Sequence, residues 1–328
     1  MDPREIEAKA NEFRSKYKLL KTEIAKAIVG HDEVVDGVLT AMFAGGNCLL
    51  EGVPGLGKTL LVHTLAAAIG SRFARIQCTP DLMPADVLGT RILVDDEAGG
   101  RRMTFEPGPV FTEVLLADEV NRATPRTQSA LLEAMQEGSV TLGGVARPLP
   151  DLFFVLATQN PIDMEGTYPL PEAQLDRFLF KLQVGYPDRD HERSMVKLHG
   201  HRTAMPTLEE LGVTAVADLP TIEACRAVVR EVRLSDEIVD YVVDLVRATR
   251  GRPTVACGAS PRAANMLASA SRALAVLRGR DFVTPDDVKA LAVPTLRHRL
   301  VLAPGAEIEG LTAEGEVRRV LEEVAAPR

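Results

Sequence analysis

Residues 47–69 read NCLLEGVPGLGKTLLVHTLAAAI, and this stretch decides the fold. An apolar strand runs into a glycine-rich loop, and the loop opens directly into an apolar helix. The loop fits the pattern G-x-x-x-x-G-K-[ST] at every fixed position between Gly52 and Thr59. Such a loop wraps its backbone N–H groups around phosphate oxygens, and the helix N-terminus adds positive potential. We therefore predict a phosphate-binding strand–loop–helix unit.

The lysine of this loop separates a phosphate site from an ordinary glycine turn. A cation at a helix N-terminus opposes the helix dipole, so a purely structural turn leaves Lys58 unexplained. We expect Lys58 to bind the β- and γ-phosphates and the Thr59 hydroxyl to ligate Mg²⁺. The other contacts with the nucleotide are predicted for Gly52, Pro54, Gly55, Leu56, Gly57 and Leu60.

A second apolar strand, Val114–Ala117, ends in the carboxylates Asp118 and Glu119. In isolation, an apolar run ending in Asp-Glu is also typical of a strand that leads into a surface loop. Beside the phosphate loop, Asp118 can hold Mg²⁺ through its water shell, and Glu119 can orient and deprotonate the attacking water.

The stretch ATQNP places Asn160 after a third apolar strand. Its amide can bind the γ-phosphate or the attacking water, but Asn-Pro is equally good turn chemistry. The guanine-binding pattern N-K-x-D does not occur in the sequence, which favours ATP. Gly30 and His31, just before the first strand, are candidates for framing the adenine.

The predicted elements form an α/β unit followed by a helical one. Strands alternating with helices indicate a parallel sheet covered on both faces. Two insertions, at 90–106 and 139–149, are predicted to be hairpins that turn at 95–100 and at Gly143-Gly144. Beyond Tyr186 we predict helices and no strand, so the domains are 1–187 and 188–328. The predicted strands are 47–50, 73–78, 114–117, 153–157 and 178–184, and the predicted helices are 4–29, 59–69, 125–137, 222–232, 238–248, 262–277 and 286–291.

The amino-acid composition argues against several classes of protein function. The chain has 328 residues and 46 acidic against 38 basic side chains, a net charge of −8, and it has no Trp and 4% aromatic residues. This balance argues against a nucleic-acid-wrapping protein. The N-terminal stretch has no apolar signal core, and no uncharged apolar run approaches 18 residues, so we predict a cytoplasmic protein that does not insert into a membrane. The four scattered cysteines and the isolated His199/His201 pair indicate neither a disulfide framework nor a metal site.

The order of the motifs resembles that of AAA+ ATPases. The phrases GVPGLGKT, DEVNRATPRTQSALLEAMQEG, ATQNPIDMEGTYPLPEAQLDRF and LRHRL are similar to those of the MoxR family, chaperone-like AAA+ proteins of the helix-2-insert clade that are related to magnesium chelatase. The resemblance covers residues 20–325. It implies a P-loop AAA+ parallel sheet core followed by an all-helical lid domain, with both hairpins at the positions of that clade's inserts. The departure is His31, where such proteins often have Gln.

The resemblance also implies roles for particular residues. It makes Asn160 the first sensor, Arg177 the arginine finger and Arg262 the second sensor. Without the resemblance, a local ion pair between Asp176 and Arg177 at a helix end explains these residues as well as an arginine finger does. For Arg262, a cation in the first turn of a helix that begins Ser260-Pro261 independently suggests a nearby anion. Asn121 and Arg122, directly after Glu119, either cap a loop or couple the site to a neighbouring subunit.

The predicted function is an ATP hydrolase that assembles into a ring, a hexamer by resemblance, with ATP bound between subunits. The resemblance implies remodelling or maturation of client proteins, including cofactor or metal insertion, and a von Willebrand A-type partner. The alternatives are a nucleic-acid motor, with Arg101, Arg102 or Arg147 on the hairpins contacting phosphates, and a nucleotide-gated scaffold without turnover. A scaffold that binds nucleotide without hydrolysing it does not need both a complete phosphate loop and an Asp-Glu pair, so these motifs favour hydrolysis.

Overall fold

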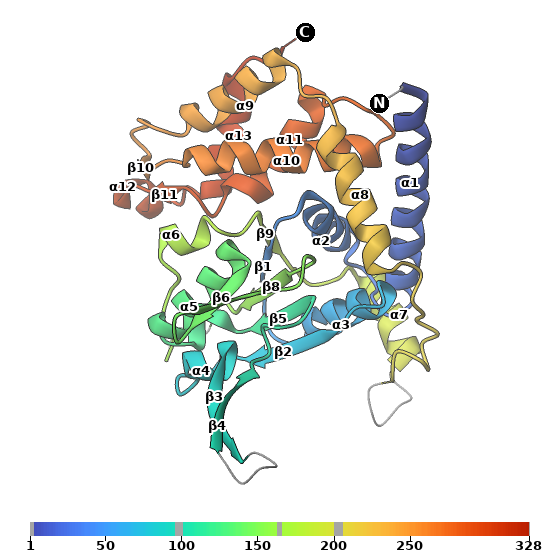
Figure 1. Ribbon diagram of the computed structural model, residues 1–328. Helices are drawn as coiled ribbons and strands as arrows, with labels where there is room; N and C mark the ends of the chain where they lie inside the picture. Colours follow the sequence, from blue (N-terminus) through green and yellow to red (C-terminus); the bar gives the residue numbers. More distant parts are fainter. Residues whose placement is uncertain (1–2, 96–100, 163–165, 200–205, 328) are drawn as a thin grey trace.

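The protein was analysed as a computed structural model that describes residues 3–95, 101–162, 166–199 and 206–327. A central sheet of five parallel strands, in the order β2-β5-β8-β1-β9, supports the fold (Figure 1). The parallel sheet predicted from the sequence is confirmed. The strands are β1 (Cys48–Glu51), β2 (Phe73–Gln77), β5 (Val114–Asp118), β8 (Phe154–Gln159) and β9 (Phe180–Gln183).

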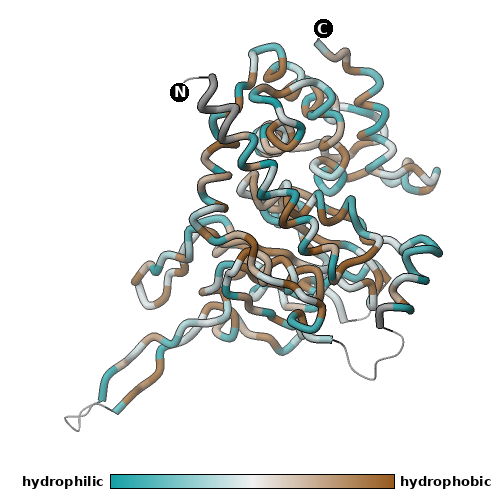
Figure 2. The backbone as a smooth tube through the Cα atoms, turned by 90° about the vertical axis from the view of Figure 1, so that its right-hand side faces the viewer, coloured by the Kyte–Doolittle hydropathy of each residue, from teal (hydrophilic) through white to brown (hydrophobic). Residues whose placement is uncertain are grey.

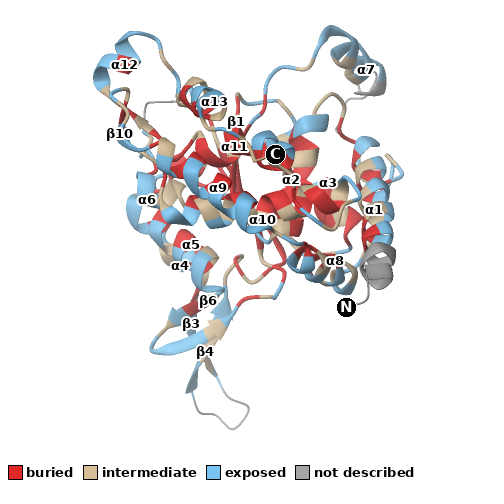
Figure 3. Ribbon diagram, turned by 90° about the horizontal axis from the view of Figure 1, so that it is seen from above, coloured by how far each residue is buried: buried red, intermediate tan, exposed pale blue. Residues whose placement is uncertain are grey.

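Both faces of the sheet are buried, which explains why its central strands are continuous apolar runs. Side chains alternate along a strand, so Leu50 faces one core cluster and Leu49 the other. Buried residues fill the region between the helices (Figure 3). The first cluster includes residues of α1 (Pro3–Ala25), α2 (Asp32–Ala44) and α3 (Lys58–Ala68), and the second includes residues of α4 (Pro84–Leu88), the short helix η1 (Val120–Arg122) and α5 (Pro125–Glu137).

The N-terminal helix is shorter than predicted. We expected one helix over 4–29, but α1 ends at Ala25 and the helix α2, which the sequence analysis did not assign, begins at Asp32. Gly30 lies between them at φ +80°, a left-handed conformation that ends a helical run. The chain therefore turns back, and α2 packs against α8 and α10 of the C-terminal half.

Both predicted hairpins are present. The first pairs β3 (Gly89–Asp95) with β4 (Arg101–Pro107) and projects from the body of the protein (Figure 2), while its turn at 96–100 lies outside the described residues. The second pairs β6 (Ser139–Leu142) with β7 (Val145–Pro148) through Gly143 and Gly144, both at positive φ as a two-residue hairpin turn requires.

The C-terminal half is helical except for one small sheet. We predicted no strand beyond Tyr186, and this was wrong, because β10 (Val255–Cys257) pairs with β11 (Val301–Leu302). Strands of three and two residues are too short to produce a recognisable alternation. No helix in the described part of the chain is long and apolar enough to cross a bilayer. The helices are α6 (Glu172–Leu175), α7 (Arg189–His199), α8 (Leu219–Glu231), α9 (Asp236–Ala248), α10 (Pro261–Leu277), α11 (Pro285–Leu296), α12 (Pro304–Ile308) and α13 (Ala313–Glu323).

Candidate active site

The phosphate loop joins the end of β1 to the start of α3. Gly55 and Gly57 have φ of +85° and +75°, which L side chains rarely adopt. A Cβ on Gly52 would lie 2.5 Å from the carbonyl oxygen of Val184, so the loop passes close to the chain that leaves β9. The backbone conformation or the close approach of Val184 therefore requires glycine at these three positions, and Pro54, Gly55, Leu56 and Gly57 line a cavity beside the loop.

Lys58 is the first residue of α3, and its ammonium donates to the carbonyl oxygen of Gly52. Burial lowers the pKa of Lys58, while the carboxylates of Asp118, Glu119 and Glu51 act in the opposite direction. The lysine therefore faces both predicted catalytic carboxylates across the loop, which is the position from which it can neutralise a phosphate chain.

Asp118 ends β5 and is buried, at 8% exposure. The Thr59 hydroxyl lies 3.4 Å from its Oδ2, and the Thr158 hydroxyl donates to its Oδ1 at 2.5 Å. Arg75, on the adjacent strand β2, donates to Oδ2 at 2.7 Å. Since β5 lies between β2 and β8, both neighbouring strands hold this carboxylate.

The pair of Thr59 and Asp118 fits Mg²⁺. This ion prefers oxygen ligands and is bound in nucleotide sites by one or two protein oxygens, substrate phosphates and water. Among the described residues, no group of three or more His, Cys, Asp or Glu side chains is placed to hold a metal ion.

Glu119 is the only non-glycine residue with positive φ, at +55°, in the described part of the chain. Its backbone N–H donates to the Thr158 hydroxyl at 2.8 Å. Its carboxylate accepts from Gln77 at 3.3 Å and from Arg122 at 3.1 Å. A strained backbone held by its neighbours is common at functional sites, and here it directs the carboxylate away from the line of the strand.

Asn160 follows directly after β8 and is 6% exposed. Its Oδ1 accepts from the backbone N–H of Ile162 at 3.2 Å, which is the turn chemistry considered above. Because β8 lies between β5 and β1, Asn160 leaves the sheet at the same edge as Glu119 and the phosphate loop. We call this edge, where the parallel strands end, the carboxyl edge.

A cavity of about 370 Å³ adjoins the phosphate loop. Leu56, Leu60, His31 and Tyr186 are among the residues that line it, and Gly30 and His31 line a smaller cavity beside α7. The buried Nε2 of His31 has no hydrogen-bond partner in the described part of the protein. Burial, and next the nearby His191, lower the pKa of His31, so a neutral imidazole faces an apolar cavity. This environment suits a heterocyclic base.

Arg177 and Arg262 lie away from this edge. Asp176 and Arg177 precede β9, and Leu179 donates its backbone N–H to Asn47, which precedes β1. They are therefore at the amino edge, where the parallel strands begin. The Ser260 hydroxyl donates to Asp176 at 2.9 Å, which brings the first turn of α10, with Arg262, to the same place.

The local ion pair considered as the alternative for Asp176 and Arg177 is not formed. Asp176 pairs with Arg299 instead, at 2.7 Å from Nε to Oδ1. Ser260 occupies the N-cap position of α10 without a side-chain capping hydrogen bond, and its hydroxyl donates to Asp176. The side chains of Arg177 and Arg262 make no hydrogen bond or ion pair with any residue that the structure describes.

Three residues of the site escaped the sequence analysis: Arg75, Gln77 and the hydroxyl of Thr158. Arg75 and Gln77 lie on the same face of β2, on either side of the buried Ile76. This alternation predicts which face they share but not what lies opposite them. Only the pairing of β2 with β5 shows that these side chains lie beside Asp118 and Glu119.

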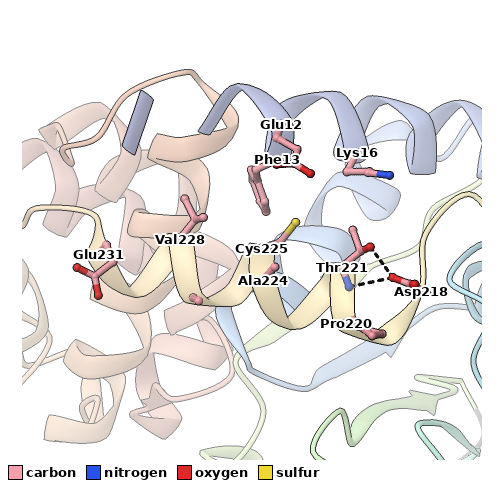
Figure 4. Close-up of a pocket in the computed structure, with 11 residues that line it drawn as sticks. Glu12, Phe13, Lys16, Asp218, Pro220, Thr221, Ala224, Cys225, Val228 and Glu231 are labelled. Carbon is pink, nitrogen blue, oxygen red and sulfur yellow. Dashed lines mark hydrogen bonds between the residues drawn. The ribbon is translucent and has the colours of Figure 1, made fainter. Parts of the chain in front are cut away.

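A second concavity, of about 500 Å³, lies between α1 and α8, away from the phosphate loop (Figure 4). Phe13 of α1 faces Cys225 and Val228 of α8 across it. Charged side chains occupy its rim, and burial raises the pKa of the Cys225 thiol to about 12. This groove has no arrangement of polar groups comparable with the carboxyl edge.

Comparisons with known proteins agree with this geometry. The family profile of the ATPases associated with various cellular activities (AAA) matches residues 47–180, and that of the AAA lid domain matches 247–320. The chain is 47% identical to protein YeaC of Bacillus subtilis over 93% of its own length and 92% of that protein, and 44% identical to chaperone MoxR1 of Mycobacterium tuberculosis over 93% and 81%. Protein MoxR of Methylorubrum extorquens is 33% identical over 98% of both chains. A crystal structure of a protein from Cytophaga hutchinsonii superposes with a TM-score of 0.90 at 38% identity over the whole of both chains. The chain therefore belongs to the MoxR family of AAA+ ATPases, as a chaperone-like ATPase with a parallel α/β core and a helical lid.

Proposed function

We propose that the chain hydrolyses ATP at the interfaces of a closed ring and uses the hydrolysis to remodel or mature client proteins. The observation that carries this proposal is the separation of the site residues. The phosphate loop, Asp118 and Glu119 lie at the carboxyl edge, while Arg177 and Arg262 lie at the amino edge. One chain alone cannot bring both sets to the same phosphate.

A head-to-tail contact between identical chains solves this problem. It places the amino edge of one subunit against the carboxyl edge of the next, and such a heterologous interface closes into a ring when its rotation permits. Arg177, as the arginine finger, and Arg262, as the second sensor, then complete the neighbour's site. We propose a hexamer, as the family resemblance implies.

The chemical step assigns one task to each residue at the carboxyl edge. Lys58 binds the β- and γ-phosphates, Thr59 and Asp118 would hold Mg²⁺, and Asn160 senses the γ-phosphate or orients the water. Bound magnesium neutralises charge on the β- and γ-phosphate oxygens. Glu119 accepts the proton as water attacks the γ-phosphorus, and the bond to the bridging oxygen breaks to leave ADP and phosphate.

The adenine is proposed to bind in the cavity beside His31, with Gly30 permitting the turn there. The loop residues Gly52, Pro54, Gly55, Leu56, Gly57 and Leu60 are proposed to surround the phosphates and ribose. We propose that the chain divides near residue 187 into the ATP-binding domain 1–187 and the lid 188–328, and that hydrolysis moves one against the other.

The side chains on the first hairpin favour a protein as the client over a nucleic acid. Ile92, Leu93 and Met103 are exposed large apolar side chains on it, and Leu93 pairs with Met103 across the strands. The arginines considered for a nucleic-acid motor are partly engaged, since Arg101 pairs with Asp95 at 3.3 Å and Arg147 lies over the ring of Phe105 at 4.1 Å. We propose a cytoplasmic setting and a von Willebrand A-type partner; cofactor or metal insertion is one form the maturation can take.

Three variants test the proposal in purified, assembled protein. Lys58→Ala should abolish ATP binding, and Glu119→Gln should bind ATP without turnover. Arg177→Ala should bind ATP and assemble but lose about 10³-fold or more in turnover, the value expected of an arginine finger. Normal turnover by Glu119→Gln, or by assembled Arg177→Ala, would refute the assignment. A pull-down with Glu119→Gln in ATP should then retain the client.

A further inference from the structure

Arg299, within the stretch LRHRL, is a buried charged residue to which the proposed function gives no task. It follows α11, and its side chain is 1% exposed. A guanidinium this deeply buried requires partners for its charge and its N–H groups. Arg299 contacts the Thr295 carbonyl, His298 and the Met266 sulfur, and its other partners lie on the short segment that carries Arg177.

The contacts of Arg299 fix that segment on both sides of Arg177. Its Nε donates to the Asp176 carboxylate at 2.7 Å. Its Nη2 donates to the carbonyl oxygens of Asp176 at 3.1 Å and Phe178 at 2.6 Å, and its Nη1 donates to that of Leu179 at 3.3 Å. The backbone on both sides of Arg177 is therefore held, while its side chain makes no hydrogen bond or ion pair with a described residue.

The same carboxylate connects the segment to the lid. Asp176 Oδ1 accepts from Arg299, and its Oδ2 accepts from the Ser260 hydroxyl at 2.9 Å. Ser260 is the N-cap residue of α10, two positions before Arg262. Arg177 and Arg262, 85 residues apart (262 − 177), are thus joined through one carboxylate.

We propose that Arg299 is a positioning residue that, through Asp176 and Ser260, presents Arg177 and Arg262 to the neighbouring subunit as a single unit. This inference rests on the proposed function and adds to it the device that orients both interface arginines. An arginine suits the position, because its planar fork carries five N–H donors, whereas a lysine ammonium has three donors at a single point.

The test uses Asp176→Asn, which keeps the side-chain volume and removes the charge that Arg299 and Ser260 share. Ser260→Ala removes only the connection to α10. The matched control is Ser269→Ala, on the same helix, whose hydroxyl donates to Ala44 at 3.1 Å, far along α10 from this network. All three are assayed as full-length assembled protein, with thermal unfolding to verify folding.

We expect Asp176→Asn to lower kcat by about ten- to hundredfold, as for a small misplacement of a catalytic group. The KM for ATP should stay within about threefold of wild type, because the phosphate loop lies at the opposite edge of the sheet. Ser260→Ala should lower kcat less, and the double variant should be no slower than Asp176→Asn, because both changes break one network. Ser269→Ala should match wild type.

Mixed assemblies separate positioning from general damage. An Asp176→Asn subunit retains its own phosphate loop and Glu119, and a Glu119→Gln neighbour retains Arg177. An equimolar mixture should therefore regain activity, to about a quarter of wild type if subunits mix at random around a heterologous ring. The inference is overturned if the mixture is no more active than the two variants measured separately. It is also overturned if Asp176→Asn has the kcat of wild type, or if its defect is confined to an increased KM for ATP.

The outcome for Arg177→Ala distinguishes this failure from failure of the proposed function. If assembled Arg177→Ala turns over normally, the interface finger itself is refuted, and the positioning role with it. If Arg177→Ala is inactive but Asp176→Asn is normal, the interface site stands and only the role of Arg299 is refuted.

Discussion

Replacing Thr158 with Val should weaken the support of both Asp118 and Glu119, although the two side chains have nearly the same shape. Thr158 is fully buried, and its hydroxyl both donates to Asp118 and accepts from the backbone N–H of Glu119. Valine preserves the shape but makes neither contact. The variant therefore leaves a carboxylate oxygen and an amide without this partner while creating no cavity.

The magnitude follows from these two contacts. A hydrogen bond to a charged group contributes about 1.5–3 kcal/mol, and an unsatisfied buried donor costs about 1–3 kcal/mol. Together they predict that Thr158→Val destabilises the region around β5 and β8 by about 2.5–6 kcal/mol. Because Asp118 and Glu119 lose a shared support, kcat should fall by about tenfold or more.

Two measurements check this prediction. Hydrogen exchange of peptides covering 114–119 should be faster in Thr158→Val, and steady-state ATP hydrolysis should be slower. The matched control is Thr158→Ser, which keeps the hydroxyl and should resemble wild type in both. If Thr158→Val and Thr158→Ser behave alike, the hydroxyl does not support the catalytic carboxylates and the reasoning is wrong.

Three further predictions concern other parts of the molecule. Burial keeps the pKa of His298 well below its usual range, so below pH 6.5 the unfolded chain binds a proton that the folded chain does not. Acidification below pH 6.5 should therefore reduce the free energy of unfolding of wild type more than that of His298→Gln, by up to about 1.4 kcal/mol per pH unit in a denaturant titration. Gly52→Ala should weaken ATP binding at least about tenfold in a calorimetric titration, because the new methyl group meets the Val184 carbonyl. Gly305→Ala is the control: a Cβ there meets no atom within 4 Å and the backbone is not left-handed, so the affinity should not change. In the native protein a maleimide should modify Cys257 alone, since the other three cysteines are buried; intact-mass analysis showing further modification would contradict this.

Much of the site was predictable because its motifs are local. A phosphate loop needs its glycines, lysine and hydroxyl within a few residues, and the carboxylates follow the end of one strand. The turn at Gly143-Gly144 and the box that Thr284 and Asp287 form at the start of α11 are local in the same sense. In each case a residue contacts its own near neighbours, so spacing alone indicates the structure.

The helix α2 shows where local patterns fail. Buried residues occupy Val34, Val35 and every position from Val38 to Phe43, and the helix packs against α1, α8, α10 and β9. Among its first six residues, Asp32, Glu33, Asp36 and Gly37 are exposed or half-buried. The stretch from Val38 to Phe43 is buried throughout and shows no 3.6-residue period, so the polar face is too short to identify the helix from the sequence. The packing of the C-terminal half onto α2 accounts for this weak amphipathic pattern.

The residues that we propose to position the catalytic groups lack a sequence signal for a related reason. Arg299 and Asp176 are 123 positions apart, and Arg75 and Asp118 are 43 apart. In isolation LRHRL is typical of a basic helix C-terminus, where cations interact favourably with the negative end of the helix dipole and face solvent. Its burial depends on the course of the chain, because the segment after α11 passes along the amino edge where the carbonyls before β9 need donors. The groups that touch ATP are confined by the shape of ATP, and therefore recur in recognisable spacing. The groups that hold them need only meet in space, so any pair of distant positions can supply them, and only the folded structure identifies which pair does.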